Sequence, residues 1–267
     1  MPIVKVNGIH IYYDLQGSEN LPCLVLNNGI LMNAATGWKL QEEIFSKSYR
    51  LLKYDFRGQG DSEHPKGEYT MELHTDDLAE LMTNLNIKKK AHIAGLSYGG
   101  AVAQAFVLKY PELCHSLILA GITSEISSRL KLIVNGWLNH AKNGDLESFF
   151  SSTVPWFFTS ETIVENPQIL ENAKKRYAKL DFSAVAKLCK CFLSVNFTQQ
   201  LKEISVPTCI LVGEKDLLAE HSYVEIMHQN IPTNELHIIP SAGHVICWER
   251  VEEFNSIIMG FLSKQMV

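Results

Sequence analysis

One serine occupies a setting that could make it a nucleophile. The stretch Gly95-Leu96-Ser97-Tyr98-Gly99 places Ser97 between glycines, after an apolar run that predicts a strand and before a pattern that predicts a helix. By chance, this spacing arises in roughly one chain in ten of this length. A sharp strand-to-helix turn would strain the serine backbone, and flanking glycines avoid collisions of Cβ atoms. The alternative is that Ser97 only caps the following helix.

A serine hydroxyl needs a base, and the base needs a carboxylate that orients it. In a parallel sheet, catalytic groups lie on loops beyond the carboxyl ends of strands. Of the ten histidines, only His244 directly follows a late predicted strand. Asp216 lies in the loop after another one, and Glu214 and Glu125 are alternative carboxylates. The chain order Ser, Asp, His favours Asp216.

The elements that must position these residues alternate along the chain. Apolar runs that predict strands occur at 23–27, 49–54, 92–94, 117–120, 208–212 and 235–239. Patterns that predict helices occur at 38–46, 72–85, 98–110, 222–229 and 251–263. Continuous hydrophobic runs are typical of parallel strands covered on both faces, so the sequence predicts an α/β fold with a mostly parallel sheet flanked by helices. The first residues predict a hairpin around Asn7-Gly8.

This alternation stops between residues 122 and 205. Helical patterns in this stretch are separated by turn signals at Asn143-Gly144, Pro155 and Asn166-Pro167. We therefore interpret residues 122–205 as a helical insertion into a core formed by residues 1–121 and 206–267. The sequence has no internal repeat and no low-complexity linker.

Composition narrows the class of protein. The 267 residues are 46% hydrophobic and 20% charged, with a net charge of −5. The longest basic run is Lys88-Lys89-Lys90, so neither nucleic acid nor a membrane surface is an expected partner. No apolar stretch reaches the ~18 residues of a membrane span, and the start does not read as a signal peptide. Six scattered cysteines predict free, buried thiols in a cytoplasmic protein, with no metal site.

These motifs together resemble the α/β-hydrolase family, and most closely its 3-oxoadipate enol-lactonases and small carboxylesterases and thioesterases. The matching stretches are GLSYGG from Gly95, DFRGQGDS from Asp55, LVGEKD from Leu211, and SAGH from Ser241 with a downstream Glu249. The resemblance covers nearly the whole chain outside the insertion. It implies an eight-stranded type of sheet with a helical cap. It also implies that Ser97 is the nucleophile, His244 the general base and acid, and Asp216 its orienter.

The pair Asn28-Gly29 is typical of a hairpin turn, but its flanks lack the alternation of a returning strand. The resemblance offers another interpretation, because the family usually has His-Gly here, followed by a backbone donor for the oxyanion. The donors would then be the N–H groups of Ile30 and Tyr98. Two preset donors stabilise charge that develops only in the transition state. Asn28, in place of the histidine, is a candidate for substrate contact.

The insertion resembles the family's cap, which covers the site and selects the substrate. Trp137 and Trp156 are our candidates for pocket residues among its aromatic side chains. Its basic residues include Arg176 and Lys179, and we interpret them as a solvated helix face rather than as ligands of an anionic substrate end. The cluster Asp55, Arg57 and Asp61 is interpreted as structural, because its glycines allow a turn and its charges can pair.

The resulting hypothesis is a cofactor-independent serine hydrolase that cleaves a small ester, lactone or thioester through an acyl-enzyme. Its partner would be a small-molecule acyl substrate, including a thioester attached to a carrier. The same triad could instead pass the acyl group to another acceptor or cleave a carbon–carbon bond beside a ketone. A non-catalytic small-molecule receptor of the same fold is a third alternative. The sequence does not indicate acyl length or oligomeric state.

Overall fold

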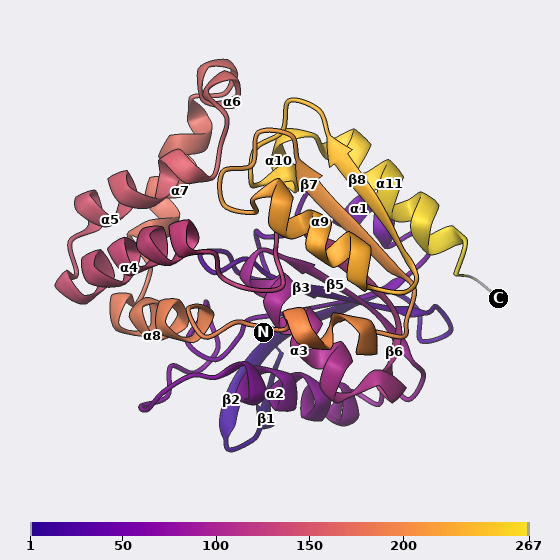
Figure 1. The fold of residues 1–267 in the computed structure, drawn as a ribbon. Helices are drawn as coiled ribbons and strands as arrows, with labels where there is room; N and C mark the ends of the chain where they lie inside the picture. The colour runs from indigo at the N-terminus through magenta and orange to yellow at the C-terminus, as the bar shows by residue number, and fades with distance from the viewer. Residues whose placement is uncertain (1, 266–267) are drawn as a thin grey trace.

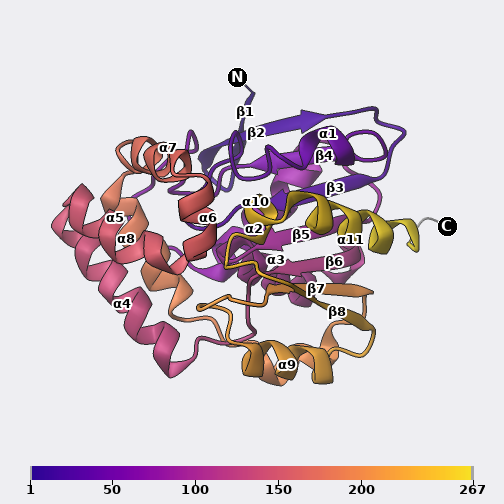
Figure 2. The same ribbon diagram turned by 90° about the horizontal axis from the view of Figure 1, so that it is seen from above.

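Eight strands form one sheet in the order β1-β2-β4-β3-β5-β6-β7-β8 in the computed structural model, which describes residues 2–265 (Figures 1 and 2). The strands are β1 (Ile3–Val6), β2 (Ile9–Gln16), β3 (Cys23–Asn27), β4 (Arg50–Tyr54), β5 (Ala91–Leu96), β6 (Cys114–Ala120), β7 (Thr208–Gly213) and β8 (Asn234–Ile239). Strands β1 and β2 are antiparallel to their neighbours, and all other pairs are parallel. The predicted fold is confirmed.

The strand sequences match their positions in the sheet. Every residue of β3, β5 and β7 is buried, as expected for strands that helices cover on both faces. At the edge of the sheet, β1 and β2 form the predicted hairpin, in which Asn7 and Gly8 both have positive φ (45° and 83°). Two consecutive residues with positive φ are typical of the tight turns that join twisted antiparallel strands.

Helices cover both faces of the sheet, with α2 and α3 on one face and α1 and α11 on the other (Figures 1 and 2). The core helices are α1 (Glu42–Phe45), α2 (Met71–Asn84), α3 (Tyr98–Lys109), α9 (His221–Asn230), α10 (Ile246–Glu249) and α11 (Val251–Ser263), with a short 3-10 helix, η1 (Pro111–Leu113). Thr70 caps α2 by accepting a hydrogen bond from the Leu73 N–H. Helix α9 contacts β7 and β8 at the far end of the sheet.

One predicted helix is mostly absent. We expected a helix over 38–46, but only Glu42–Phe45 is helical. Residues 34–41 form turns, in which the N–H groups of Lys39 and Gln41 donate to carbonyls three residues earlier. The apolar spacing that predicted a longer helix instead reflects burial of Trp38, which packs against Phe254 of α11.

The insertion between β6 and β7 consists of helices that lie to one side of the sheet (Figure 1). We call residues 122–205 the cap. Its helices are α4 (Ser128–Asn143), α5 (Leu146–Thr153), η2 (Val154–Trp156), α6 (Ser160–Glu165), α7 (Gln168–Tyr177), α8 (Phe182–Phe192) and η3 (Thr198–Glu203). The turns fall where the sequence signals them: Gly144 ends α4 in the left-handed conformation, and Pro167 immediately precedes α7.

The parallel register brings the carboxyl ends of the inner strands to one edge of the sheet. Asn27 of β3 pairs with Gly95 of β5, and Leu96 pairs with Ala120 of β6. Gly213 of β7 pairs with Ile239 of β8. The loops that follow these strands, together with the cap entered from β6, therefore lie next to one another.

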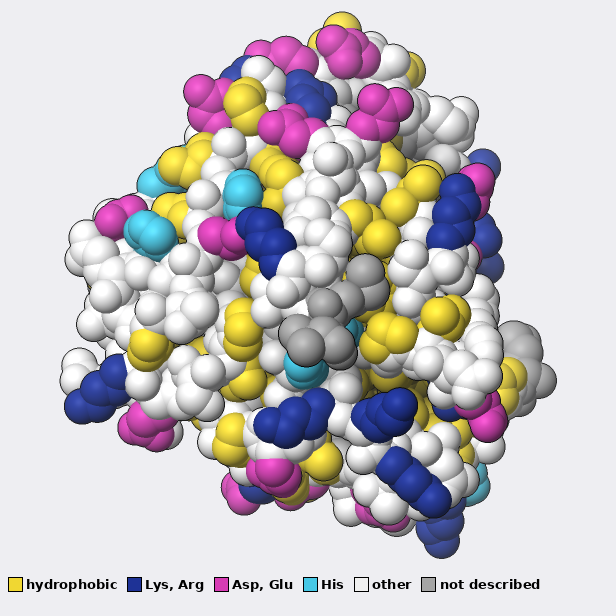
Figure 3. Space-filling view, turned by 90° about the vertical axis from the view of Figure 1, so that its right-hand side faces the viewer, with side chains coloured by type: hydrophobic (Ala, Val, Ile, Leu, Met, Phe, Trp, Pro, Cys, Tyr) yellow, Lys and Arg dark blue, Asp and Glu magenta, His cyan; other side chains and the backbone are white. Residues whose placement is uncertain are grey.

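The cysteines and the charged surface side chains are spread over the fold. All six cysteines are free and buried, as predicted. On the face shown in Figure 3, basic and acidic side chains are interspersed, with hydrophobic side chains between them. Across residues 2–265, none of the helices has both the length and the apolar character needed to cross a bilayer.

Candidate active site

Ser97 lies at the turn between β5 and α3, with φ 53° and ψ −120°. A positive φ is uncommon for a residue with a side chain, and such strain is concentrated at functional sites. The chain can turn this sharply because two glycines flank it. A Cβ on Gly95 would lie 2.2 Å from the Gly99 carbonyl oxygen, and one on Gly99 would lie 2.3 Å from the Asn27 carbonyl oxygen. The Ser97 hydroxyl makes no capping hydrogen bond to α3.

His244 is brought to this hydroxyl, and Asp216 is brought to His244. His244 Nε2 lies 2.9 Å from Ser97 Oγ, and His244 Nδ1 lies 2.9 Å from Asp216 Oδ2. The histidine and the aspartate are buried, with 4% and 6% of their surface exposed. We call these three residues the triad. A hydroxyl, an imidazole and a carboxylate in this order can move a proton off the hydroxyl as it attacks an electrophile.

The Asp216 carboxylate is held ionised by its surroundings. Burial favours its neutral form, but the charge of His244, the hydrogen bond with it and backbone N–H donors outweigh burial, so the pKa lies below the usual value. Oδ1 accepts hydrogen bonds from the N–H groups of Leu218 and Ala219, at 2.8 and 3.0 Å. An ionised carboxylate with a fixed orientation is what a histidine base requires.

The two alternative carboxylates have other partners. Glu214 accepts a hydrogen bond from the Ser241 N–H at 2.8 Å, which ties the β7 loop to the loop that carries His244. Glu125 accepts from the Thr198 hydroxyl at 2.7 Å within the cap. Of the three acidic candidates, Asp216 alone is hydrogen-bonded to His244.

The two residues expected to donate to an oxyanion, Tyr98 and Ile30, both lie near Ser97. Tyr98 is the first residue of α3, so its N–H belongs to the first turn of a helix, where amides have no intrahelical partner. Ile30 lies in the loop after β3 and lines both hollows described below together with Ser97. Gln59 donates to the carbonyl oxygens of Gly29 (2.8 Å) and Ile30 (3.3 Å), which holds this loop in place. Nothing in the sequence indicates this contact.

Two hollows meet at the triad, and both are lined by Ile30, Ser97 and His244. The first hollow has about 400 Å³ of open space. Its other lining residues are Gly29, Leu31, Met32, Leu96, Phe157, Phe158, Arg176, Tyr177, Val245 and Trp248. The second hollow has about 320 Å³. Its other lining residues are Gly121, Ile122, Thr123, Leu130, Trp137, Phe192, Leu218 and Ala219. Both are mainly apolar, and the cap forms part of each wall.

Some sequence-based assignments differ from the structure. Asn28 is fully buried, and its side chain donates to the Tyr54 carbonyl at 2.8 Å, so it supports the loop and lines neither hollow. The Asn28 side chain packs against Gly37 in the interior and does not face a substrate. Trp156 is half-buried in η2 and also lines neither hollow, whereas Trp137 lines the second.

Two aromatic contacts of the site were not anticipated. The Phe157 ring stacks on the His244 imidazole, with centroids 5.9 Å apart, and its carbonyl accepts from the Val245 N–H. Trp248 lies under the Arg176 guanidinium, 5.2 Å from the ring centroid to Cζ. Phe157 is one of several consecutive cap aromatics, and only tertiary contacts distinguish it. In the sequence, only the position of Trp248, four residues after His244, could have indicated the second contact.

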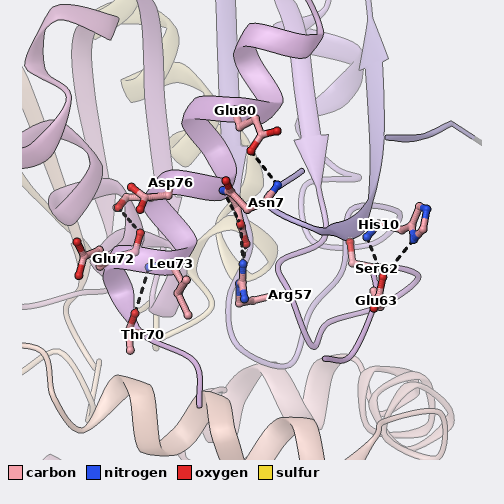
Figure 4. A network of polar contacts seen from close by, with 12 residues as sticks. Asn7, His10, Arg57, Ser62, Glu63, Thr70, Glu72, Leu73, Asp76 and Glu80 are labelled. Atoms are coloured by element: carbon pink, nitrogen blue, oxygen red, sulfur yellow. Dashed lines mark hydrogen bonds and ion pairs between the residues drawn. The ribbon is translucent and has the colours of Figure 1, made fainter. Parts of the chain in front are cut away.

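The charged cluster after β4 supports the fold, as interpreted. Asp55 accepts from the N–H groups of Ala34 (2.6 Å) and Asp61 (2.8 Å), and burial raises its pKa to about 6. Arg57 forms two 2.7 Å hydrogen bonds with Asp77 of α2, in the network that also joins Asn7 to this helix (Figure 4). None of these charged groups lines either hollow at the triad.

Among residues 2–265, one group of side chains has the spacing of metal ligands: Cys209, Glu235 and His237. They lie on β7 and β8, and none of them lines either hollow. Glu235 is already paired with Lys264 and His237. This group is therefore separate from the site at Ser97.

Comparisons with known proteins agree with this geometry. The sequence model of the alpha/beta hydrolase fold matches residues 22–251. A 3-oxoadipate enol-lactonase of Acinetobacter baylyi is 26% identical over 264 residues, covering 97% of this chain and 96% of the relative. A proline iminopeptidase of Thermoplasma volcanium is 26% identical over 286 residues, covering 98% and 96%.

Solved structures show the same likeness. The crystal structure of an enol-lactonase from Burkholderia xenovorans is 27% identical with a TM-score of 0.91, covering 98% of this chain and 100% of that one. The matched family region includes the inner strands, the cap and all three residues of the triad. This protein therefore belongs to the α/β hydrolase fold family.

Proposed function

We propose that this protein is a serine hydrolase that cleaves small esters, lactones or thioesters. The observation that carries the proposal is the continuous hydrogen-bonded chain from Ser97 Oγ through His244 to Asp216, placed where two hollows meet. Two hollows suit a substrate whose reacting carbonyl separates an acyl group from a leaving group.

The proposed reaction assigns a role to each of these atoms. Ser97 Oγ bonds to the carbonyl carbon while its proton passes to His244 Nε2, and the N–H groups of Ile30 and Tyr98 stabilise the oxyanion. His244 then gives the proton to the leaving oxygen or sulfur as its bond to carbon breaks. Water, deprotonated by His244, attacks the acyl-enzyme, and the acid is released as the proton returns to Ser97.

The lining of the hollows favours esters over peptides with a free amino terminus. An aminopeptidase must bind a substrate ammonium group, which requires carboxylates or other acceptors in its pocket. No Asp or Glu lines either hollow, and the one formal charge besides the triad is the cation Arg176. The named activities of the relatives support this choice only in part. One relative is a lactonase, which agrees with it, and the other is an iminopeptidase, which does not.

A fluorophosphonate probe tests the proposal directly. We expect covalent labelling of the wild-type protein at Ser97 and its loss in Ser97→Ala. Ser124, a buried serine with a hydroxyl partner in Thr198, provides the control, and Ser124→Ala should be labelled at the wild-type rate. Labelling that persists in Ser97→Ala, or that is absent from the wild type, would reject the proposal. Hydrolysis of uncharged p-nitrophenyl esters should follow the labelling in every variant.

A further inference from the structure

Arg176 is the cation of the first hollow, and most of its donors have no protein partner. It lies in α7, on the wall of the hollow that contains Ser97 and His244. Its Nε donates to the Leu31 carbonyl at 3.2 Å, and its guanidinium lies over the Trp248 ring. Within residues 2–265, no carboxylate forms an ion pair with Arg176, and its two terminal nitrogens donate no hydrogen bond. A guanidinium has five N–H donors, so four remain available.

Arg176 is half-buried, so its charge is partly withdrawn from water. Burial lowers the pKa of the Arg176 guanidinium, although an arginine stays protonated in proteins. Removing a charge from water destabilises a fold unless an opposite charge or hydrogen bonds replace the water. Contact with Trp248 offsets part of this cost, because an aromatic face attracts cations. An anion that enters the hollow would supply the missing partner.

We propose that Arg176 binds a carboxylate of the substrate, so that this enzyme acts on esters, lactones or thioesters whose acyl or alcohol part ends in a carboxylate. The inference rests on the proposed hydrolase function and specifies its substrate class. The guanidinium and the triad share one hollow whose other walls are apolar, among them Met32, Phe158 and Val245. An apolar chain with one terminal anion matches such a lining.

A carboxylate fits this position better than a phosphate. Beyond Arg176 lies a third hollow of about 650 Å³, which is also lined by Lys179, His64, Asp61 and Asp181. Its two carboxylates would repel a phosphate dianion, and Asp181 is already paired with His64 at 2.9 Å. A single negative charge is matched by the single free guanidinium, whose planar fork suits two carboxylate oxygens.

Matched substrates test the proposal. The anionic series is monoethyl succinate, glutarate and adipate, compared with ethyl esters in which an isopropyl group replaces the terminal carboxylate. Acetate esters of ω-hydroxy acids, compared with acetates of branched alcohols, place the charge on the alcohol side. Hydrolysis is followed by titration of released acid. We expect at least one anionic ester to exceed its neutral counterpart in kcat/KM by about tenfold or more.

Variants assign this preference to Arg176. Arg176→Gln should lower kcat/KM for the preferred anionic ester by about 10- to 100-fold, mainly through KM, and change the neutral counterpart by less than about threefold. Arg176→Lys should give an intermediate loss, because it keeps the charge but not the fork. The control is Lys175→Gln, which removes the same charge from an exposed neighbour on α7 and should leave the preference unchanged. Equal losses on charged and neutral esters would overturn the proposal, as would the absence of any anionic preference.

Two further measurements test the anion site independently of the proposed hydrolase activity. Labelling by the uncharged fluorophosphonate reports on the triad alone, and it should be retained in Arg176→Gln, which also shows that this variant folds. Calorimetric titration of Ser97→Ala with the same anionic esters, each of which carries one carboxylate, reports on anion binding without turnover. Binding of one of these esters that disappears when Arg176→Gln is added supports the anion site whatever the triad does. No binding of any of these esters, in a protein that the probe labels when Ser97 is present, would overturn the anion site and leave the hydrolase standing.

Discussion

The side-chain amide of Gln59 donates a 2.8 Å hydrogen bond to the carbonyl oxygen of Gly29. That carbonyl and the Ile30 N–H belong to the same planar trans peptide, in which the two groups point in opposite directions. Fixing the Gly29 carbonyl on Gln59 therefore aims the Ile30 N–H away from Gln59. Ile30 lines both hollows, so this bond, together with the one that the same carbonyl accepts from the Met32 N–H at 3.1 Å, sets the direction of a proposed oxyanion donor.

We expect Gln59→Leu to lower kcat on neutral esters by about tenfold or more with little change in KM, because a misdirected donor costs stabilisation in the transition state only. The matched control is Gln41→Leu. Gln41 is also buried and donates at 2.8 Å to a carbonyl, but that carbonyl belongs to Cys247, which lines neither hollow. Steady-state kinetics of the two variants, with thermal unfolding to compare their stabilities, tests the prediction. Equal losses of kcat would contradict it.

Substitution of Asp216 should lower kcat far more than substitution of a neighbouring carboxylate. Asp216→Asn keeps the shape of the side chain but removes the charge that holds His244, and we expect kcat to fall by about a thousandfold or more. Glu214 is two residues before Asp216, but it accepts a hydrogen bond from the Ser241 N–H and none from the imidazole. Glu214→Gln should therefore lower kcat by less than about tenfold. Comparable losses in both variants would mean that charge near the loop, and not contact with His244, controls the rate.

The acid side of the pH profile should reflect a single proton. The pKa of Asp216 is lowered from its usual value, so this carboxylate stays ionised well into the acid range. Protonation of a histidine removes the base. We therefore expect kcat/KM on a neutral ester to decline on acidification, with a limiting slope of one log unit per pH unit. A profile that stays level down to pH 5, or that falls with a slope of two above pH 5, would contradict this assignment.

Two buried histidines outside the site should make the fold sensitive to acid. Burial lowers the pKa of His74 to about 3 and that of His92 to about 4, from an ordinary value of 6.5. Between these values and pH 6.5 the unfolded chain binds protons that the folded chain does not, so stability present at neutral pH is lost as the pH falls. Each histidine accounts for at most about 1.4 kcal/mol per pH unit, and the two together account for about 3 kcal/mol between pH 6.5 and pH 5.

Urea unfolding at several pH values between 7.5 and 5 measures this loss. His92→Gln should be less stable than the wild type at neutral pH, but it should lose less stability on acidification. His74→Gln should show the same two differences. If both variants show the wild-type slope, burial of His74 and His92 is not its cause.

The sequence by itself determined what depends on local spacing. Glycines two residues before and after Ser97 predicted a strand-to-helix turn, because a Cβ at either position would overlap backbone atoms. Unbroken apolar runs predicted the parallel sheet, since strands covered on both faces have no polar side. The order of the strands then restricted the histidine to His244, which follows the last of them.

Only the tertiary structure decided among residues that the sequence left equivalent. Asp216, Glu214 and Glu125 all follow strands, and the direction of each side chain depends on contacts with loops distant in sequence. Asn28 was expected at the substrate, but the carbonyl of Tyr54 on the neighbouring strand turns it inward. Arg176 is one of many basic cap residues and becomes distinctive only where α7 meets the loop after β3 and Trp248. Spacing along the chain encodes local conformation, whereas burial and pairing of a charge depend on segments that meet only on folding.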